Sequence, residues 1–226
     1  MLGTFIPALS IDLDLHHQGS DHTPLSAMEL SLTPSANLRY EQLNEQNIIP
    51  INEPLSPGDR KVLTLRALVL DESYADMKLQ GSFFYVKQHE DGTISRHSVD
   101  FDHSIPLSVL MAPVEPISPE AFSACLSNFE EFQHTATTSF VAKNATTEED
   151  FKSVLNAITR ICGVHVVEQI PGASSIYGKA IQGFQIAGLI KLNGHTTEGM
   201  ELSLQLKSSN ERFITGLVHA VESQYP

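Results

Sequence analysis

The sequence predicts two successive domains of different class. An immunoglobulin-like β-sandwich is expected over residues 1–112, and an α+β platform, an antiparallel sheet flanked by helices, over residues 113–226. In the first half, apolar residues recur at every second position, the period of a strand with one buried face. In the second half, segments with the period of amphipathic helices alternate with further strand segments. A chain of 226 residues is long enough for both cores.

The β-sandwich is predicted from alternation and from turn residues. Apolar and polar residues alternate along the first segments, and residues 90–92, Glu-Asp-Gly, form a typical hairpin turn. No stretch of this half has the pattern of a long amphipathic helix. The strands are therefore predicted at residues 11–16, 28–33, 61–70, 77–87 and 93–102.

The predicted junction between the domains is rich in proline, which cannot donate a hydrogen bond to a sheet ladder. Within it, every second position carries an apolar side chain, at Ile105, Leu107, Val109 and Met111. This alternation predicts that the junction is itself a strand added to one of the sheets, which would stiffen it. The prolines are Pro106, Pro113, Pro116 and Pro119.

Three helices of the platform are predicted from their start signals. Ser118 precedes Pro119 and begins a helix with Phe122, Cys125, Leu126 and Phe129 at helical spacing. Thr147 and Asp150 form a capping-box pattern, and Gly163 ends that helix. Ser208 with Glu211 is expected to begin the last helix. Strands are predicted at 164–169, 174–182, 184–192 and 200–206.

Composition narrows the classes of partner. Acidic residues outnumber basic ones by 27 to 14, for a formal net charge of −13, so nucleic acid and anionic lipid surfaces are not expected as direct partners. The longest uncharged apolar stretches, 104–114 and 180–190, are too short to cross a bilayer. Two cysteines, Cys125 and Cys162, lie in apolar helical patterns and are expected to be reduced core thiols of a cytosolic protein.

Catalytic motifs fail on spacing or on partners. Between Gly172 and Gly178 stand five residues where a phosphate-binding loop has four, and Ala180 occupies the place of the required hydroxyl. Cys162 and His165 are interpreted as packing residues, since a thiol at a helix end beside a strand histidine rarely forms a catalytic pair. The ten histidines show no metal-ligand spacing. The sequence therefore predicts no enzyme activity, no metal and no cofactor.

Several stretches together resemble a known family. Residues 162–169, 173–183 and 187–191 are similar to the C-terminal ear (appendage) of delta-adaptin, a large subunit of the third heterotetrameric adaptor complex. Residues 77–87, followed by 90–92, are similar to the sandwich of that ear. The similarity covers roughly residues 60–220. Clathrin-adaptor ears hold peptides with an exposed Trp, and because this chain has none, that pocket cannot be transferred.

The resemblance implies a non-catalytic role in vesicle coats that carry cargo from the Golgi or endosomes to lysosome-related compartments. It implies a cytoplasmic module, peripheral on membranes through its parent complex and attached by a flexible hinge. Its expected partners are accessory proteins, the lysosomal tethering machinery or other subunits of the same complex.

The residues themselves leave three hypotheses open. In the first, the platform sheet, or its groove with the helices, binds partners through apolar side chains beside lysines, which would suit an acidic peptide. In the second, the chain is a structural spacer whose acidic sandwich strand, with Asp12 and Asp14, meets a basic partner. The third is an enzyme with an unrecognised site. The residues proposed for the first hypothesis are Tyr177, Lys179, Ile181, Phe184, Ile186 and Lys191.

Overall fold

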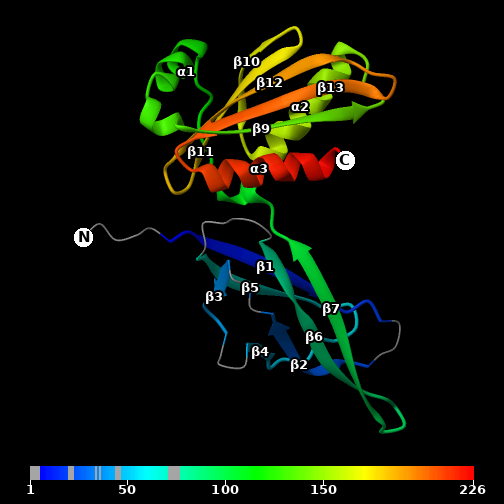
Figure 1. Ribbon diagram of the computed structural model, residues 1–226. Helices are drawn as coiled ribbons and strands as arrows, with labels where there is room; N and C mark the ends of the chain where they lie inside the picture. The colour runs from blue at the N-terminus through cyan, green and yellow to red at the C-terminus, as the bar shows by residue number, and fades with distance from the viewer. Residues whose placement is uncertain (1–5, 20–22, 34, 36, 44–46, 71–76) are drawn as a thin grey trace, which may run out of the picture. The chain divides into compact units, whose positions relative to one another are not determined.

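The computed structural model describes residues 6–19, 23–33, 35, 37–43, 47–70 and 77–226 (Figure 1). The chain divides into two compact units, one ending at Ile105 and the other running from Pro106 to Pro226. The first is a β-sandwich and the second combines one antiparallel sheet with three α-helices, so the predicted fold class is confirmed. The division falls before the expected boundary at residue 112, because residues 106–112 belong to the second unit.

The sandwich consists of a three-stranded sheet and a four-stranded sheet, both antiparallel. The predicted alternation is confirmed, since its apolar positions face the space between the sheets and include the buried Met28, Leu30 and Leu65. The first sheet has the order β1 (Ala8–His16), β5 (Arg60–Val69), β3 (Leu38–Tyr40). The second has the order β4 (Ile48–Ile51), β2 (Leu25–Leu32), β6 (Lys78–Gln88), β7 (Ile94–Ser104).

The hairpin of β6 and β7 confirms the predicted turn. Gly92 has φ 81°, a left-handed conformation that favours glycine. The backbone N–H and the hydroxyl of Thr93 both donate to the Asp91 carboxylate, which closes the turn. The short strands β3 and β4 were not predicted, because three or four residues are too few to show a period.

The predicted junction strand is wrong over most of its length. Leu107–Leu110 form a 3-10 helix, η1, and only β8 (Met111–Ala112) pairs with a sheet, beside Lys179 and Ala180. The sequence suggested the two-residue period of a strand, but the buried residues are Leu107 and Leu110, which are three positions apart, one turn of a 3-10 helix. η1 packs against α2 (Glu148–Cys162).

The second unit, called the platform below, is built on one antiparallel sheet of six strands. Its order is β10, β11, β12, β13, β9, with β8 paired to the end of β11. β9, which lies between α1 and α2 in the chain, forms one edge of the sheet. The bounds are β9 (His134–Lys143), β10 (His165–Ile170), β11 (Ala173–Ala180), β12 (Gln185–His195) and β13 (Gly199–Ser208).

Local sequence signals define α1 (Pro119–Leu126) and α2. The Ala121 N–H donates to the Ser118 hydroxyl at the start of α1. Thr147 and Asp150 form the predicted capping box of α2, and Gly163 ends that helix with φ 65°. These three signals are confirmed. A second 3-10 helix, η2 (Phe129–Phe132), follows α1.

The predicted cap of α3 (Glu211–Gln224) is wrong by two residues. Asn210, and not Ser208, accepts a hydrogen bond from the Phe213 N–H. Ser208 is still in β13, where its hydroxyl donates to the Gln185 carbonyl at 2.6 Å. Because the Ser208 side chain is held in the sheet by this hydrogen bond, the cap of α3 falls to Asn210. None of the helices within the described residues is long and apolar enough to cross a membrane.

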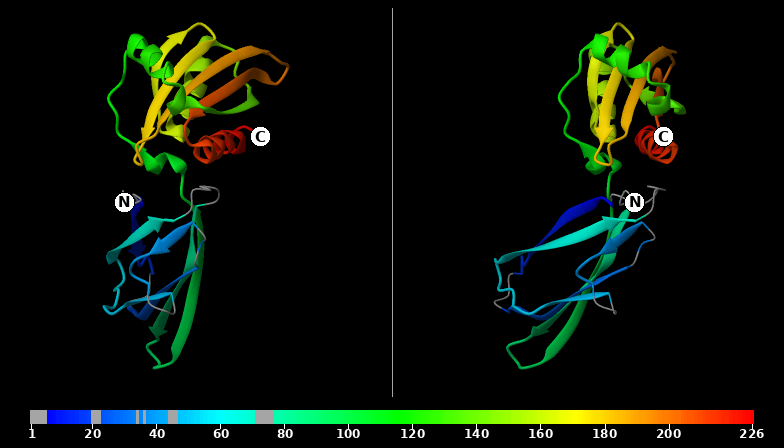
Figure 2. Two further views of the ribbon diagram at one scale, coloured as in Figure 1. Left: turned by 60° about the vertical axis from the view of Figure 1, so that its left-hand side comes forward. Right: turned by 90° about the vertical axis from the view of Figure 1, so that its left-hand side faces the viewer.

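One face of the platform sheet packs against α2 and α3 (Figures 1 and 2). The strand residues Ile190, Leu204 and Leu206 on this face have no exposed surface, and neither does Phe213 of α3. The Phe140 ring stacks on Tyr225 at the end of α3, with centroids 4.8 Å apart. The opposite face of the sheet, called the open face, is covered at one end only, by α1 and η2.

Candidate functional site

The open face is defined by the strand register. One row of paired residues crosses four strands on this face: Tyr177 on β11, Ala187 on β12, Lys207 on β13 and Thr135 on β9. Their neighbours one residue along point into the helix-covered core, as the fully buried Ile176 does. The side chains of the open face are thus held by a rigid sheet, and no long helix covers them.

α1 and η2 lie across one end of the open face. The Phe122 ring of α1 meets the Tyr177 ring edge-on, with centroids 6.4 Å apart. The Tyr177 hydroxyl donates to Gln185 Oε1 at 2.8 Å. Burial raises the pKa of Tyr177, and the nearby Cys125 and Glu131 add to this. Tyr177 is therefore a neutral, 9% exposed anchor for α1.

Beside α1 the open face is hollowed. One hollow of about 160 Å³ is lined by Phe122, Leu126, Ala187, Leu189 and Lys207, among others. A second, of about 370 Å³, shares Leu189 and Gln205 with the first and continues toward β9. We call the two together the open-face groove. Its second part is lined by Thr137, Thr138, Ser139, Leu189, Lys191, Ser203, Leu204 and Gln205.

The groove differs in charge from the chain as a whole. Its lining residues include two lysines, Lys191 and Lys207, and no aspartate or glutamate. The whole chain, by contrast, has 27 acidic residues against 14 basic ones. The groove is therefore a local basic feature on an acidic protein, which the linear sequence did not reveal because the two lysines lie on different strands.

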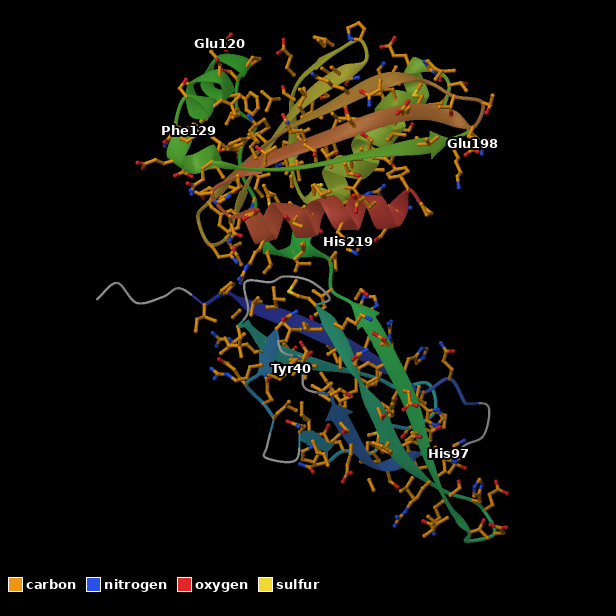
Figure 3. All side chains as sticks on the ribbon, in the orientation of Figure 1. Tyr40, His97, Glu120, Phe129, Glu198 and His219 are labelled. Carbon is orange, nitrogen blue, oxygen red and sulfur yellow. The ribbon has the colours of Figure 1, made fainter. Side chains whose placement is uncertain are left out.

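Exposed apolar side chains lie next to the groove. Leu126 at the end of α1 lines the groove and is 41% exposed. Phe129, labelled in Figure 3, lies in η2 and is 80% exposed. The helical spacing of these residues predicted a buried stripe, yet α1 has no buried residue. The apolar residues do lie at helical spacing, but α1 is short and lies across one end of the sheet, so it does not bury them in a core. Exposed rings of this kind are typical of protein-binding surfaces.

The six residues proposed from the sequence lie in three different places. Tyr177, Lys179 and Lys191 are on the open face, where Lys191 lines the groove. Ile186 is fully buried on the helix-covered face, and Phe184 packs edge-on against Phe213 of α3 at 5.1 Å. Ile181 follows the end of β11, where its N–H donates to the Leu110 carbonyl. Ile186 thus has no surface with which to contact a partner.

Sequence reasoning missed Phe122, Leu126, Phe129 and Lys207 as candidate binding residues. The signal that could have found the first three is the seven-residue interval between Leu126 and the start of β9 at His134, together with Pro119. A helix of only eight residues is seldom a core element, and its apolar residues are therefore candidates for a rim.

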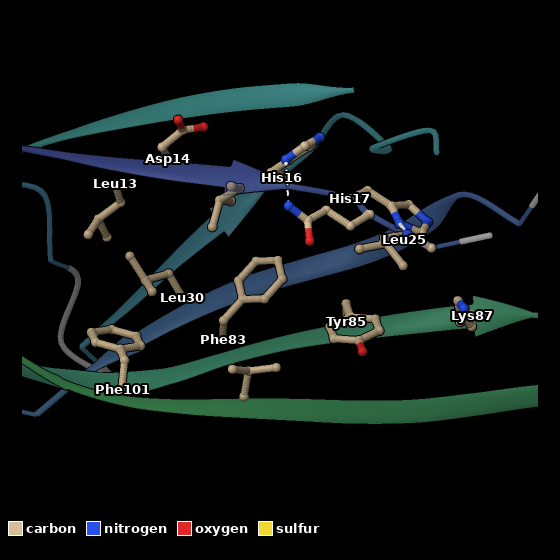
Figure 4. A pocket seen from close by; sticks show the side chains of 14 residues that line it. Leu13, Asp14, His16, His17, Leu25, Leu30, Phe83, Tyr85, Lys87 and Phe101 are labelled. Atoms are coloured by element: carbon tan, nitrogen blue, oxygen red, sulfur yellow. Dashed lines mark hydrogen bonds between the residues drawn. The ribbon is translucent and has the colours of Figure 1, made fainter. Parts of the chain in front are cut away.

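The sandwich has a cleft of its own, of about 460 Å³, between the edge strands of its two sheets (Figure 4). Leu13 of β1, Phe83 and Tyr85 of β6, and Phe101 of β7 face into it. The neighbouring acidic residues are already engaged: Asp14 pairs with Arg60, and Asp12 accepts a hydrogen bond from Thr64 at 2.7 Å. These contacts weaken the hypothesis that Asp12 and Asp14 form an acidic docking strand.

Among the described residues, neither the buried thiol nor the metal-ligating side chains offer a catalytic centre. Cys162 is fully buried, and burial raises the pKa of its thiol to about 12, which removes it as a nucleophile at neutral pH. Cys125 is half-buried, so the expectation of a core thiol holds for Cys162 alone. Within the described ranges, no group of three or more His, Cys, Asp or Glu side chains could hold a metal ion.

The comparison with known families gives the class of this domain. Residues 112–225, half of the chain, match the family described as the AP3 Mu C-terminal domain. The chain belongs to this family and is therefore an adaptor-complex domain, a class of domains that act in vesicle transport without catalysis. The match covers the platform and leaves the sandwich outside.

Other comparisons add little. No curated protein matches the chain. A crystal structure of a DUF4466 family protein from Parabacteroides merdae shares 9% sequence identity, with 88% of this chain and 98% of that chain covered and a TM-score of 0.19. A TM-score this low carries no inference about fold or function.

Proposed function

We propose that this chain is a non-catalytic, protein-binding appendage of a vesicle adaptor complex, of the type that the delta-adaptin ear represents. It recruits accessory or tethering proteins, or contacts other subunits of its coat, during cargo transport to lysosome-related compartments. The observation that carries the proposal is the open-face groove, which the exposed Leu126 lines, together with the exposed Phe129 of the neighbouring η2. Membership of an adaptor-complex family supports the same function.

The geometry suits recruitment of partners. A six-stranded sheet backed by α2 and α3 holds the groove in a fixed shape, so little conformational entropy is lost when a partner binds. The apolar rim supplies an anchor and the surrounding Ser, Thr, Gln and Lys side chains supply a polar border, the usual anatomy of an interface.

The proposed location follows from the same class. The chain would work in the cytoplasm, on Golgi or endosomal membranes, and would be held there through its parent complex. A net charge of −13 disfavours direct contact with anionic lipids or nucleic acid, so proteins are the proposed partners.

Proximity labelling in cells tests this function. The full chain carrying Leu126→Ser and Phe129→Ser is compared with the wild type, both fused to a biotin ligase. We expect labelling of adaptor subunits and trafficking proteins by the wild type, and a drop of about tenfold in that labelling for the double variant.

A matched control keeps the test specific. Ile94→Ser replaces a side chain that is 67% exposed on the sandwich hairpin, in the unit that does not contain the groove. It should leave the labelling pattern unchanged. If the wild type labels no trafficking protein above background, or if the double variant labels the same set as the wild type, the proposed function through this face is wrong.

A further inference from the structure

We propose that the open-face groove selects an extended acidic segment of a partner protein that carries an apolar side chain. The apolar side chain would occupy the hollow beside Phe122, Leu126 and Leu189, and carboxylates would lie at Lys191 and Lys207. This inference rests on the proposed function, because it names the kind of partner that the same face would bind.

The apolar part of the ligand follows from the hollow at α1. Phe122 and Leu126 form one wall, and Ala187 with Leu189 forms the floor on β12. Leu126 remains 41% exposed, which is apolar surface that a partner side chain would remove from water. An aliphatic or aromatic side chain fits these walls, whereas a charged one would lose its hydration there.

The acidic part follows from charge. Among the described residues, several lysines already have carboxylate partners, as Lys61 has Glu53 and Lys152 has Glu148. In this part of the chain, no ion pair within 4.0 Å uses Lys191 or Lys207. Two unpaired ammonium groups in a groove without carboxylates favour a negative ligand and disfavour a basic one.

The extended conformation follows from the shape of the floor. Thr137 and Ser139 on β9 and Ser203 on β13 have short side chains, so the groove stays shallow along the strands. The Thr137 and Ser139 hydroxyls can accept hydrogen bonds from, or donate them to, a peptide backbone, and the Ser203 hydroxyl, which donates to Asn193 Oδ1, can still accept one. A peptide lying along the strands therefore fits better than a helix, whose diameter is about 10 Å.

The register also predicts a spacing. Leu189 pairs with Gln205, and Lys191 and Lys207 each lie two residues further along their antiparallel strands, in opposite directions. Four residues at a rise of about 3.4 Å separate the two lysines by about 14 Å along the strand direction. An extended peptide would therefore present two carboxylates about four residues apart, with the apolar side chain between them.

Selection from a phage library of random dodecapeptides on the immobilised full chain tests this proposal. We expect enrichment of peptides with Asp or Glu on both sides of a Leu, Ile, Met or Phe. The double variant Lys191→Glu with Lys207→Glu should bind these peptides at least about tenfold more weakly, and Leu126→Ser should weaken them as well. Binding of the selected peptides should also fall as salt is raised.

The control is Arg212→Glu, which reverses an exposed charge at the start of α3 on the helix-covered side of the platform. It should leave peptide binding unchanged, and circular dichroism melting should show every variant folded. Enrichment of basic or uncharged peptides, equal binding by the lysine double variant, or no enrichment at all would overturn the proposal. None of these outcomes affects proximity labelling of adaptor proteins, so the proposed function is judged separately.

Discussion

The inward-facing strand residues are buried less evenly in the sandwich than in the platform, although Met28, Leu30 and Leu65 of the sandwich are fully buried. In the platform, Ile186, Ile190, Leu202, Leu204 and Leu206 have no exposed surface. In the sandwich, the corresponding inward-facing residues Leu13 and Leu15 of β1, and Phe83 and Tyr85 of β6, are only half-buried.

The difference shows what a second layer must provide. The platform sheet is covered by the long apolar stripes of α2 and α3, whereas the four-stranded sheet of the sandwich is covered by a sheet of three strands, one of them only three residues long. The narrower sheet cannot cover the inner side chains of β6 and β7, and the cleft of Figure 4 is the result. Apolar patterning therefore specifies a buried face only where the partner layer is wide enough.

The largest expected effect tests this contrast directly. Leu204→Ala should destabilise the platform by about 3 kcal/mol, since it opens a cavity in a closed core. Leu15→Ala should cost the sandwich only about 1 kcal/mol, because that side chain already contacts water. Hydrogen exchange read by mass spectrometry reports on each unit separately. Equal losses for the two variants would show that the sandwich core is as tightly packed as that of the platform.

Two glycines with positive φ extend the comparison. Gly163 at the end of α2 has φ 65°, and an added Cβ would lie 2.7 Å from Met111 Cγ. Gly58 in the sandwich has φ 86° with nothing within 4 Å. Gly163→Ala should therefore cost about 2 kcal/mol and Gly58→Ala about 1 kcal/mol, the latter from the backbone alone. Thermal melting of both variants measures this, and a larger loss for Gly58→Ala would contradict it.

The same contrast explains how far the sequence could be interpreted. Periodicity and caps predicted the fold class, most strands and the capping box of Thr147, because these depend on nearby residues. The 3-10 helix at Leu107–Leu110 and the cap at Asn210 were not predicted, because tertiary contacts of η1 and a sheet hydrogen bond of Ser208 decide them. The groove could not be predicted, since Lys191 and Lys207 come together only through the register of β12 and β13.

Loss of the capping box should have a smaller effect, confined to the platform. Thr147→Ala removes the hydroxyl that accepts from the Asp150 N–H and should cost α2 about 1 kcal/mol. Amide exchange should accelerate in α2, while the strands of the sandwich should keep their protection. Faster exchange in β1 or β6 of this variant would show that the two units share their stability.

The pH dependence of two carboxylates gives a finer test. Hydrogen bonds from the Thr146 and Thr147 N–H groups, and from the Thr147 hydroxyl, lower the pKa of Asp150 below 3.8. In the sandwich, the hydroxyl and N–H of Thr93 lower the pKa of Asp91 in the same way. A lowered folded-state pKa means that each stabilising contribution is present above the unfolded-state pKa and is lost as the pH falls through the folded-state value.

Asp150→Asn and Asp91→Asn should therefore be less stable than the wild type at pH 7. Both differences should shrink as the pH falls below 3.8. Melting temperatures taken from pH 7 down to strongly acidic buffer measure the trend. A stability difference that does not change with pH would show that the carboxylates act by packing and not by their charge.

The smallest expected effect on stability is the most informative about function. Phe129 in η2 and Ile94 in the sandwich hairpin are 80% and 67% exposed, so replacing either by Ser removes almost no buried contact. Both variants should keep the wild-type melting curve, with a change in stability within about 0.5 kcal/mol. The two residues differ in place, because only Phe129 belongs to the platform that carries the open face, and the proposed binding gives its ring a role there. If Phe129→Ser instead destabilises the platform by about 2 kcal/mol or more, the ring is a packing residue and the rim of the groove must be redrawn without it.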